Sequence, residues 1–177
     1  ISALSCSSRT DRAEGGRVHV LAETGTYVSD GGRDWTHLAG PGGRIVAGAV
    51  SDFGAGPTIY AIAAAGPADR HVHRRAGGHV YVSTDGGGAW DDVTAAVLAG
   101  IGPEEGADSA TSRRVACCRS RPQVAYLSFS LPRAGGAPGA SLRCGIARTG
   151  DGGRTWAVVW QERGKPSPNM ETTHIEP

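Results

Sequence analysis

Two charged segments of the chain combine the residue types that bind ligands or transfer protons. Segment 65–78 gathers guanidinium, imidazole and carboxylate groups at Asp69, Arg70, His71, His73, Arg74 and Arg75. Segment 98–114 sets three acids against two arginines, at Glu104, Glu105, Asp108, Arg113 and Arg114. Long charged loops on a rigid scaffold are the usual place of binding sites, which predicts ligand-binding roles for His71, His73, Arg74, Arg75, Glu104 and Glu105. The alternative is solvated loops whose surface ion pairs contribute under about 1 kcal/mol each.

The sequence lacks the residue patterns that usually bind metals or cofactors. His71 and His73 alternate as two ligands on one strand face would, but no third ligand lies near them, so no metal site is expected. Glycine-rich phosphate loops, a GxSxG elbow and HExxH are all missing, so no cofactor is expected. The four cysteines, at Cys6, Cys117, Cys118 and Cys144, show no CxxC spacing, which leaves buried thiols or one disulfide as alternatives.

Charge and hydropathy exclude further classes of partner. The net charge is +1 over 177 residues, so no general basic field indicates a nucleic-acid partner. No apolar run approaches the length needed to cross a bilayer. The N-terminus, ISALSCSS, has neither a signal-peptide pattern nor an initiator Met. We therefore expect no membrane span, and a chain that starts after processing or truncation.

One turn sequence occurs three times, as YVSDGGRDW (27–35), VYVSTDGGGAW (80–90) and ARTGDGGRTW (147–156). In each copy a strand-like run ends near an Asp, followed by Gly-Gly, two variable residues and a Trp. The carboxylate can accept hydrogen bonds from backbone N–H groups of its own turn, and the glycines supply positive φ. The Trp is expected to bury its ring beneath the turn. This predicts structural roles for Asp30, Trp35, Asp85, Trp90, Asp151 and Trp156.

Each of these turns is the third turn of a four-strand pattern. The strand-like runs are short, rich in Val, Ile, Tyr and Ala, and separated by Gly/Pro clusters. They cover 1–6, 17–23, 25–30 and 34–38, then 44–51, 57–64, 78–85 and 89–94, then 113–118, 123–130, 141–149 and 155–160. Only 94–100 could form one or two helical turns, which Gly100 would end. The pattern predicts an all-β protein.

The repeated turn resembles the Asp-box (BNR) repeat, Ser/Thr-x-Asp-x-Gly-x-Thr-Trp. Copy 149–156 fits throughout and copy 83–90 departs only at Ala89, whereas the first copy places Val28 and Asp34 in the Ser/Thr and Thr positions. Asp-box proteins such as sialidases, xyloglucan-degrading enzymes and sortilin-type receptors are β-propellers. The resemblance therefore implies blades of four antiparallel strands at 1–40, 41–97 and 98–160, with 161–177 as the link to a following blade.

A ring of this kind has about 4–8 blades, so three cannot close one. The chain is accordingly expected to be a single partial β-propeller. The remaining propeller blades, or a partner chain, would cover its blade edges. The alternative fold is a small open β-sandwich.

The blade geometry assigns the turns to two edges. First and third turns share one edge, and second turns and inter-blade links share the other, so the Asp-box turns are expected to lie away from the charged loops. The stretch 17–32 resembles the opening blade of xyloglucanase-type propellers, in which the Asp at the second turn is catalytic. Glu23 takes that position here, which implies a catalytic carboxylate, and a glycosidase needs a second one roughly 5–9.5 Å away.

Two functions follow as expectations. The first is a secreted, periplasmic or cell-surface carbohydrate-active propeller that is glycoside hydrolase-like, either a glycosidase or a polysaccharide lyase. A sialidase ranks lower because the Arg-Ile-Pro signature is not found. The second is a non-catalytic protein- or ligand-binding propeller, similar to sortilin-type receptors or photosystem-assembly proteins. A scaffold alone does not choose between enzyme and binding module.

Overall fold

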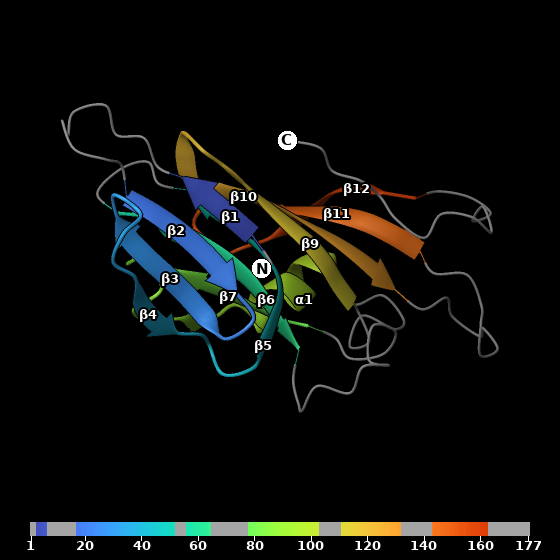
Figure 1. Ribbon diagram of the computed structural model, residues 1–177. Coiled ribbons are helices and arrows are strands. Elements are labelled where there is room, and N and C mark those ends of the chain that lie inside the picture. Colours follow the sequence, from blue (N-terminus) through green and yellow to red (C-terminus); the bar gives the residue numbers. More distant parts are fainter. Residues whose placement is uncertain are drawn as a thin grey trace.

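The strands form three four-stranded antiparallel sheets, each built from neighbours in sequence (Figure 1). The computed structural model describes residues 3–6, 17–51, 56–64, 78–102, 111–131 and 143–162. In every sheet the spatial order of the strands follows the chain order. The all-β fold class predicted from the sequence is therefore confirmed.

The strand bounds follow the predicted runs closely. The first sheet holds β1 (Ala3–Cys6), β2 (Arg17–Ala22), β3 (Gly25–Asp30) and β4 (Thr36–Ala39). The second holds β5 (Arg44–Ser51), β6 (Thr58–Ala64), β7 (His79–Ser83) and β8 (Asp91–Asp92). The third holds β9 (Thr111–Cys118), β10 (Arg121–Leu131), β11 (Arg143–Thr149) and β12 (Ala157–Gln161).

The fourth strand of each sheet begins later than predicted. It starts at 36, 91 and 157 instead of 34, 89 and 155. In the second and third sheets the carboxylate of the turn binds the backbone N–H of Ala89 and of Thr155. These residues therefore belong to the turn, and the ladder resumes only after the Trp.

One helix, α1 (Thr94–Ile101), occurs in the described ranges. It runs one residue beyond the predicted 94–100, because Gly100 does not end it. Instead, a side chain at Gly100 would collide with the backbone of Trp156. The buried side chains of Val97 and Ile101 join the core between the second and third sheets. The helix ends at Ile101 and is followed by Gly102, whose φ of 94° suits glycine.

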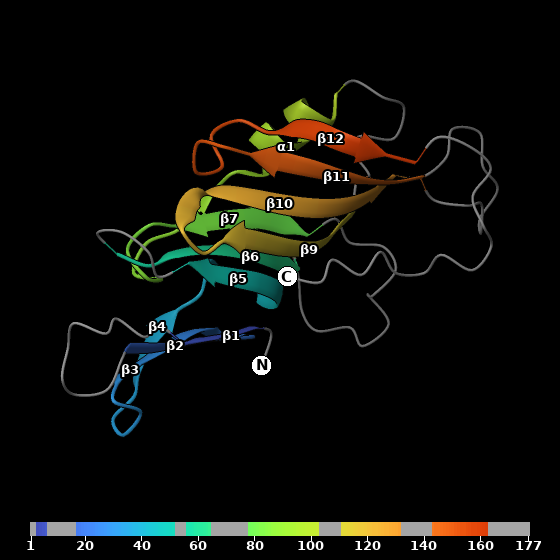
Figure 2. The ribbon, with the colours of Figure 1, turned by 90° about the horizontal axis from the view of Figure 1, so that it is seen from above.

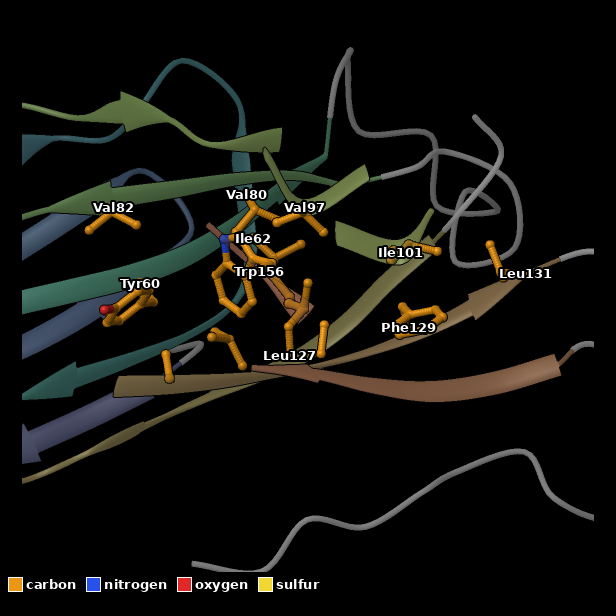
Figure 3. Close-up of a cluster of buried hydrophobic side chains, with 13 residues drawn as sticks. Tyr60, Ile62, Val80, Val82, Val97, Ile101, Leu127, Phe129, Leu131 and Trp156 are labelled. Atoms are coloured by element: carbon orange, nitrogen blue, oxygen red, sulfur yellow. The ribbon is translucent and has the colours of Figure 1, made fainter. Parts of the chain in front are cut away.

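The three sheets pack face against face in chain order. Figure 2 shows β1–β4 at one end of the molecule and β11 and β12 at the other, with β5–β7 between them. Leu21 of the first sheet packs with Ile45, Ile59, Ala61 and Ala63 of the second. The larger cluster joins the second sheet to the third and is drawn in Figure 3. Its largest fully buried side chains include Tyr60, Phe129, Ile62 and Leu127.

Alternation along β6 gives the second sheet two apolar faces. Ile59 and Ala61 point toward the first sheet, on what we call the front face. Tyr60 and Ile62 point toward the third sheet, on the back face. Because both faces are buried, the sequence of β6 is almost continuously apolar. The front face of each sheet thus meets the back face of the sheet before it.

The turns gather at two edges of the molecule, as the strand pattern predicted. First and third turns are joined by backbone hydrogen bonds. In the second sheet the Gly86 N–H donates to the Pro57 carbonyl at 3.0 Å, and in the third sheet the Gly152 N–H donates to the Gln123 carbonyl at 3.0 Å. We call this the DGG edge. At the other edge, the Ile45 N–H donates to the Glu23 carbonyl at 2.9 Å, which joins a second turn to the link into β5. We call this the second-turn edge.

Candidate functional site

The turn after β7 is organised by the carboxylate of Asp85. Its Oδ1 accepts hydrogen bonds from the backbone N–H groups of Gly88 and Ala89 at 2.9 and 3.0 Å. The Ser83 hydroxyl also donates to Oδ1 at 2.8 Å and accepts the Gly87 N–H at 2.7 Å. These bonds favour the ionised carboxylate and lower the pKa of Asp85, with the Ala89 N–H contributing most.

The turn after β11 is organised in the same way, and its carboxylate also accepts a hydrogen bond from a hydroxyl group within the turn. Asp151 accepts the hydroxyl and the backbone N–H of Thr155 at 2.6 and 3.0 Å. It also accepts the Thr149 hydroxyl at 2.9 Å, and that oxygen binds the Gly153 N–H at 2.9 Å. The Thr155 hydroxyl, the backbone N–H of Thr155 and the Thr149 hydroxyl together lower the pKa of Asp151 to about 2. The turn hydrogen bonds expected from the sequence are thus present at Asp85 and Asp151.

The first copy of the turn differs. The Asp30 carboxylate accepts two hydrogen bonds from the Arg17 guanidinium, at 2.8 and 3.0 Å, across the β2–β3 pair. Arg17 has its pKa raised by this hydrogen bond and by the negative charge of Asp30. Both side chains are about half exposed or more, so the pair contributes little to stability.

The strand register explains the difference and corrects the alignment made from the sequence. In the first sheet Leu21 of β2 pairs with Thr26 of β3, and in the second sheet Ile62 of β6 pairs with Val80 of β7. Ser29 follows Thr26 by three residues, and Ser83 follows Val80 by three residues. Ser29, not Val28, therefore holds the position of Ser83. Ser29, Ser83 and Thr149 are all at most 2% exposed. The first turn is one residue shorter, because Asp30 follows Ser29 directly, and the Ser29 hydroxyl has no hydrogen-bond partner among the described residues.

The three Trp side chains are buried to different degrees. Trp156 is 6% exposed and donates its indole N–H to the Gly153 carbonyl at 3.1 Å. Trp90 is half-buried and donates to the Ala39 carbonyl of the first sheet at 3.3 Å. Trp35 is 45% exposed, so the prediction that its ring is buried is wrong. Trp90 and Trp156 pack on the sheet that precedes their own, and the described residues hold no sheet before the first.

Glu23 lies in the second turn of the first sheet, on the second-turn edge. Its carboxylate is 3.4 Å from the Arg44 guanidinium, and the two side chains are 58% and 29% exposed. Hydrogen bonds from Ile45 to the Glu23 carbonyl and from Gly40 to the Thr24 carbonyl fix the backbone of this turn. Glu23 is therefore a solvent-accessible carboxylate beside a cation, on a turn held by two backbone hydrogen bonds.

A second polar group lies where the second sheet meets the same edge. His79 Nδ1 is 3.1 Å from Asp92 Oδ2, and the His79 ring stacks on Tyr81 with ring centroids 6.1 Å apart. Burial opposes ionisation of Asp92, but hydrogen bonds from Thr94 and His79 outweigh it and lower the pKa of Asp92. This pair was not predicted from the sequence, because His79 and Asp92 are 13 positions apart and only the β7–β8 pairing brings them together. His79 directly follows the charged segment 65–78.

The predicted ligand-binding residues, His71, His73, Arg74, Arg75, Glu104 and Glu105, lie outside the described residues. Within the described ranges, no three His, Cys, Asp or Glu side chains are grouped as metal ligands. None of the described helices combines the length and apolar character needed to cross a bilayer. Cys117 packs against the core, and the Cys118 sulfur lies 3.6 Å from the Ser120 hydroxyl oxygen.

The chain matches no family model and no curated protein. The local geometry of the turns and of the second-turn edge is therefore the basis for any functional assignment.

Proposed function

We propose that the three sheets are blades of an Asp-box β-propeller, and that this propeller is an extracytoplasmic, glycoside hydrolase-like protein acting on a polysaccharide or oligosaccharide. The consecutive four-stranded sheets and the carboxylate-capped turns at Asp85 and Asp151 support the propeller. The ligand would lie along the second-turn edge, opposite the DGG edge.

The observation that carries the proposal is the environment of Glu23. Its carboxylate is accessible, stands on a turn fixed by backbone hydrogen bonds and lies beside Arg44. Glycoside hydrolysis uses two carboxyl groups, of which Glu23 would be one and the second would lie roughly 5–9.5 Å away.

The test compares two carboxylate–arginine pairs at opposite edges. We expect Glu23→Gln to reduce cleavage of a polysaccharide substrate, measured as released reducing ends, at least about tenfold, the low end of acid–base contributions. Asp30→Asn is the matched control, because Asp30 is also exposed and paired with an arginine, but on the DGG edge. Equal loss in both variants, or no loss in either, would remove Glu23 from the site.

A second candidate function is a non-catalytic binding module. Glu23 is more than half exposed and paired with Arg44, and such a pair can hydrogen-bond to a sugar or to a protein without chemistry. Affinity electrophoresis in polysaccharide gels separates the two functions. The binding module would be favoured if the polysaccharide slows migration of the chain but no reducing ends are released. Glu23→Gln should then weaken this retardation, and Asp30→Asn should not.

A further inference from the structure

Strand β5 contains a β-bulge near the second-turn edge. Ile45 and Ala47 pair with consecutive residues of β6, so Val46 between them is an extra residue in the ladder. Bulges re-aim a side chain and are frequent at sheet edges and next to active sites. Val46 is 40% exposed and is the only exposed residue of β5. The bulge therefore brings one apolar side chain of β5 to the surface.

Strand β9 of the third sheet repeats the bulge at the equivalent position. Ser112 and Arg114 pair with consecutive residues of β10, so Arg113 is the extra residue. In both sheets the bulge lies opposite the third and fourth residues after the residue that pairs with Ser83 or Thr149. Arg113 is exposed, as its counterpart in β5 is. Two neighbouring sheets thus present one side chain each from the same structural position.

The second sheet shows which side chains stay accessible between two neighbouring sheets. It packs against the first sheet on its front face and against the third on its back face. Val46 is exposed there, whereas the next residue, Ala47, packs against the core shared with the third sheet. The bulge position is therefore accessible even in a sheet with both faces covered. The exposure of Arg113 follows from this position, whatever packs on the third sheet.

The bulge of β5 adjoins the turn that carries Glu23. Ile45, immediately before Val46, donates its N–H to the Glu23 carbonyl at 2.9 Å. β5 also contacts β9, and packed sheets lie about 10 Å apart. A ligand that lies along the second-turn edge from Glu23 would therefore reach Val46 and then Arg113.

Arg113 is held in place and keeps donors for a ligand. Its Nε donates to the Ser130 hydroxyl at 3.0 Å, and Ser130 is 3% exposed. The ion pairs within the described ranges engage Arg17 and Arg44 but not Arg113. The two terminal nitrogens of its guanidinium are therefore available, and a guanidinium binds planar or tetrahedral anionic groups through paired N–H donors.

We propose that Arg113 and Val46 determine the specificity of the second-turn edge, and that its ligand is an acidic polysaccharide. Arg113 binds the carboxylate or sulfate group of one sugar unit, and Val46 packs against the apolar face of a neighbouring unit. The inference rests on the proposed carbohydrate-binding role of this edge and adds the charge of the ligand. It does not require Glu23 to be catalytic.

Affinity electrophoresis of the purified chain compares three polysaccharides. Polygalacturonate carries carboxylates, carrageenan carries sulfates and xyloglucan is neutral. We expect at least one of the two acidic polysaccharides to slow migration more than xyloglucan does, and which one identifies the anionic group. Arg113→Gln should weaken this binding at least about fivefold, as expected for loss of one exposed ion pair. Arg154→Gln is the matched control, because Arg154 is exposed in the same sheet but on the DGG edge.

A gain of binding tests the equivalence of the two bulges. Val46→Arg gives the second sheet the arginine of the third, so affinity for the same acidic polysaccharide should rise about fivefold. Thr84→Arg is the matched control, because it adds the same charge to the same sheet at an exposed position on the DGG edge, and it should leave the affinity unchanged. Circular dichroism checks that each variant keeps its β-sheet spectrum.

The outcomes separate this inference from the proposed function. Cleavage of xyloglucan that depends on Glu23 but not on Arg113 keeps the proposed function and overturns the inference. Retardation by an acidic polysaccharide that depends on Arg113, without release of reducing ends, supports the inference and contradicts the hydrolase. Equal loss in Arg113→Gln and Arg154→Gln, or equal affinity for double-stranded DNA, indicates a non-specific charge effect and overturns the inference. Retardation by none of the three polysaccharides also overturns it.

Discussion

Three aspartates in the same local sequence have different chemical surroundings. Asp85 and Asp151 each accept hydrogen bonds from a hydroxyl and from backbone N–H groups of their own turn. The Asp30 carboxylate forms an ion pair with Arg17 across the sheet. In the first sheet Asp30 follows Ser29 directly, so its turn is one residue shorter than the other two.

At the residue scale, we expect Asp151→Asn to lower the free energy of unfolding by about 1–2 kcal/mol at pH 7, since it removes charge-assisted hydrogen bonds. The folded-state pKa is about 2, below the ordinary value of 3.8. The stabilisation from ionised Asp151 is therefore complete above the unfolded-state pKa and is lost as pH falls toward about 2.

Denaturant unfolding of wild type and variant across this pH range checks the prediction. The difference between them should be constant above about pH 4 and should shrink below it. Asp30→Asn is the control, with a change below about 1 kcal/mol for an exposed pair. A difference that grows on acidification would contradict the assignment.

At the scale of the element, α1 shows why a glycine can be required inside a helix. Glycine lowers helix stability relative to alanine by about 1 kcal/mol, so propensity alone favours Gly100→Ala. A Cβ at Gly100 would, however, overlap the backbone of Trp156, which cannot rotate away. Close approach of helix and turn therefore outweighs propensity here.

We accordingly expect Gly100→Ala to destabilise the protein by roughly 1–3 kcal/mol, the usual range for overpacking. Thermal or denaturant unfolding measures the effect. Gly56→Ala is the matched control, because a Cβ there would meet only the Thr84 carbonyl at an ordinary 3.7 Å. A stabilising Gly100→Ala would contradict the proposed contact between α1 and Trp156.

At the scale of the whole molecule, the first and second sheets meet where Leu21 fills the space above Gly48. A Cβ at Gly48 would collide with the Leu21 side chain and lie 2.9 Å from the Tyr60 carbonyl oxygen. The pair joins two sheets that share few other large side chains, since the cluster between them is the smaller of the two.

A double-mutant cycle tests this junction. We expect Gly48→Ala to cost roughly 1–3 kcal/mol in the wild type and clearly less in a Leu21→Ala background, where the obstructing side chain is gone. The resulting coupling should reach about 0.5–3 kcal/mol, as for residues in direct contact. Equal costs in both backgrounds would mean that the two sheets do not pack at this point.

The sequence by itself determined the strands and the edges at which their turns lie. Period-two apolar runs separated by glycine and proline are local signals, and so are the Asp-Gly-Gly turns at Asp85 and Asp151. The binding residues predicted in the charged segments, His71, His73, Arg74, Arg75, Glu104 and Glu105, lie outside the described residues and stay predictions, as do the propeller and its function.

Tertiary structure decided what depends on neighbours distant in sequence. Only the strand register placed Ser29 in the position of Ser83. The first turn is one residue shorter than the second, so aligning the two sequences on their aspartates puts the preceding strands out of register by one residue. Only packing separated buried Trp156 from exposed Trp35, since Trp156 packs against the second sheet and its local sequence, which is similar to that of Trp35, does not supply this neighbour. The pairing of His79 with Asp92 and of Glu23 with Arg44 likewise arises from strands that are brought together by the fold.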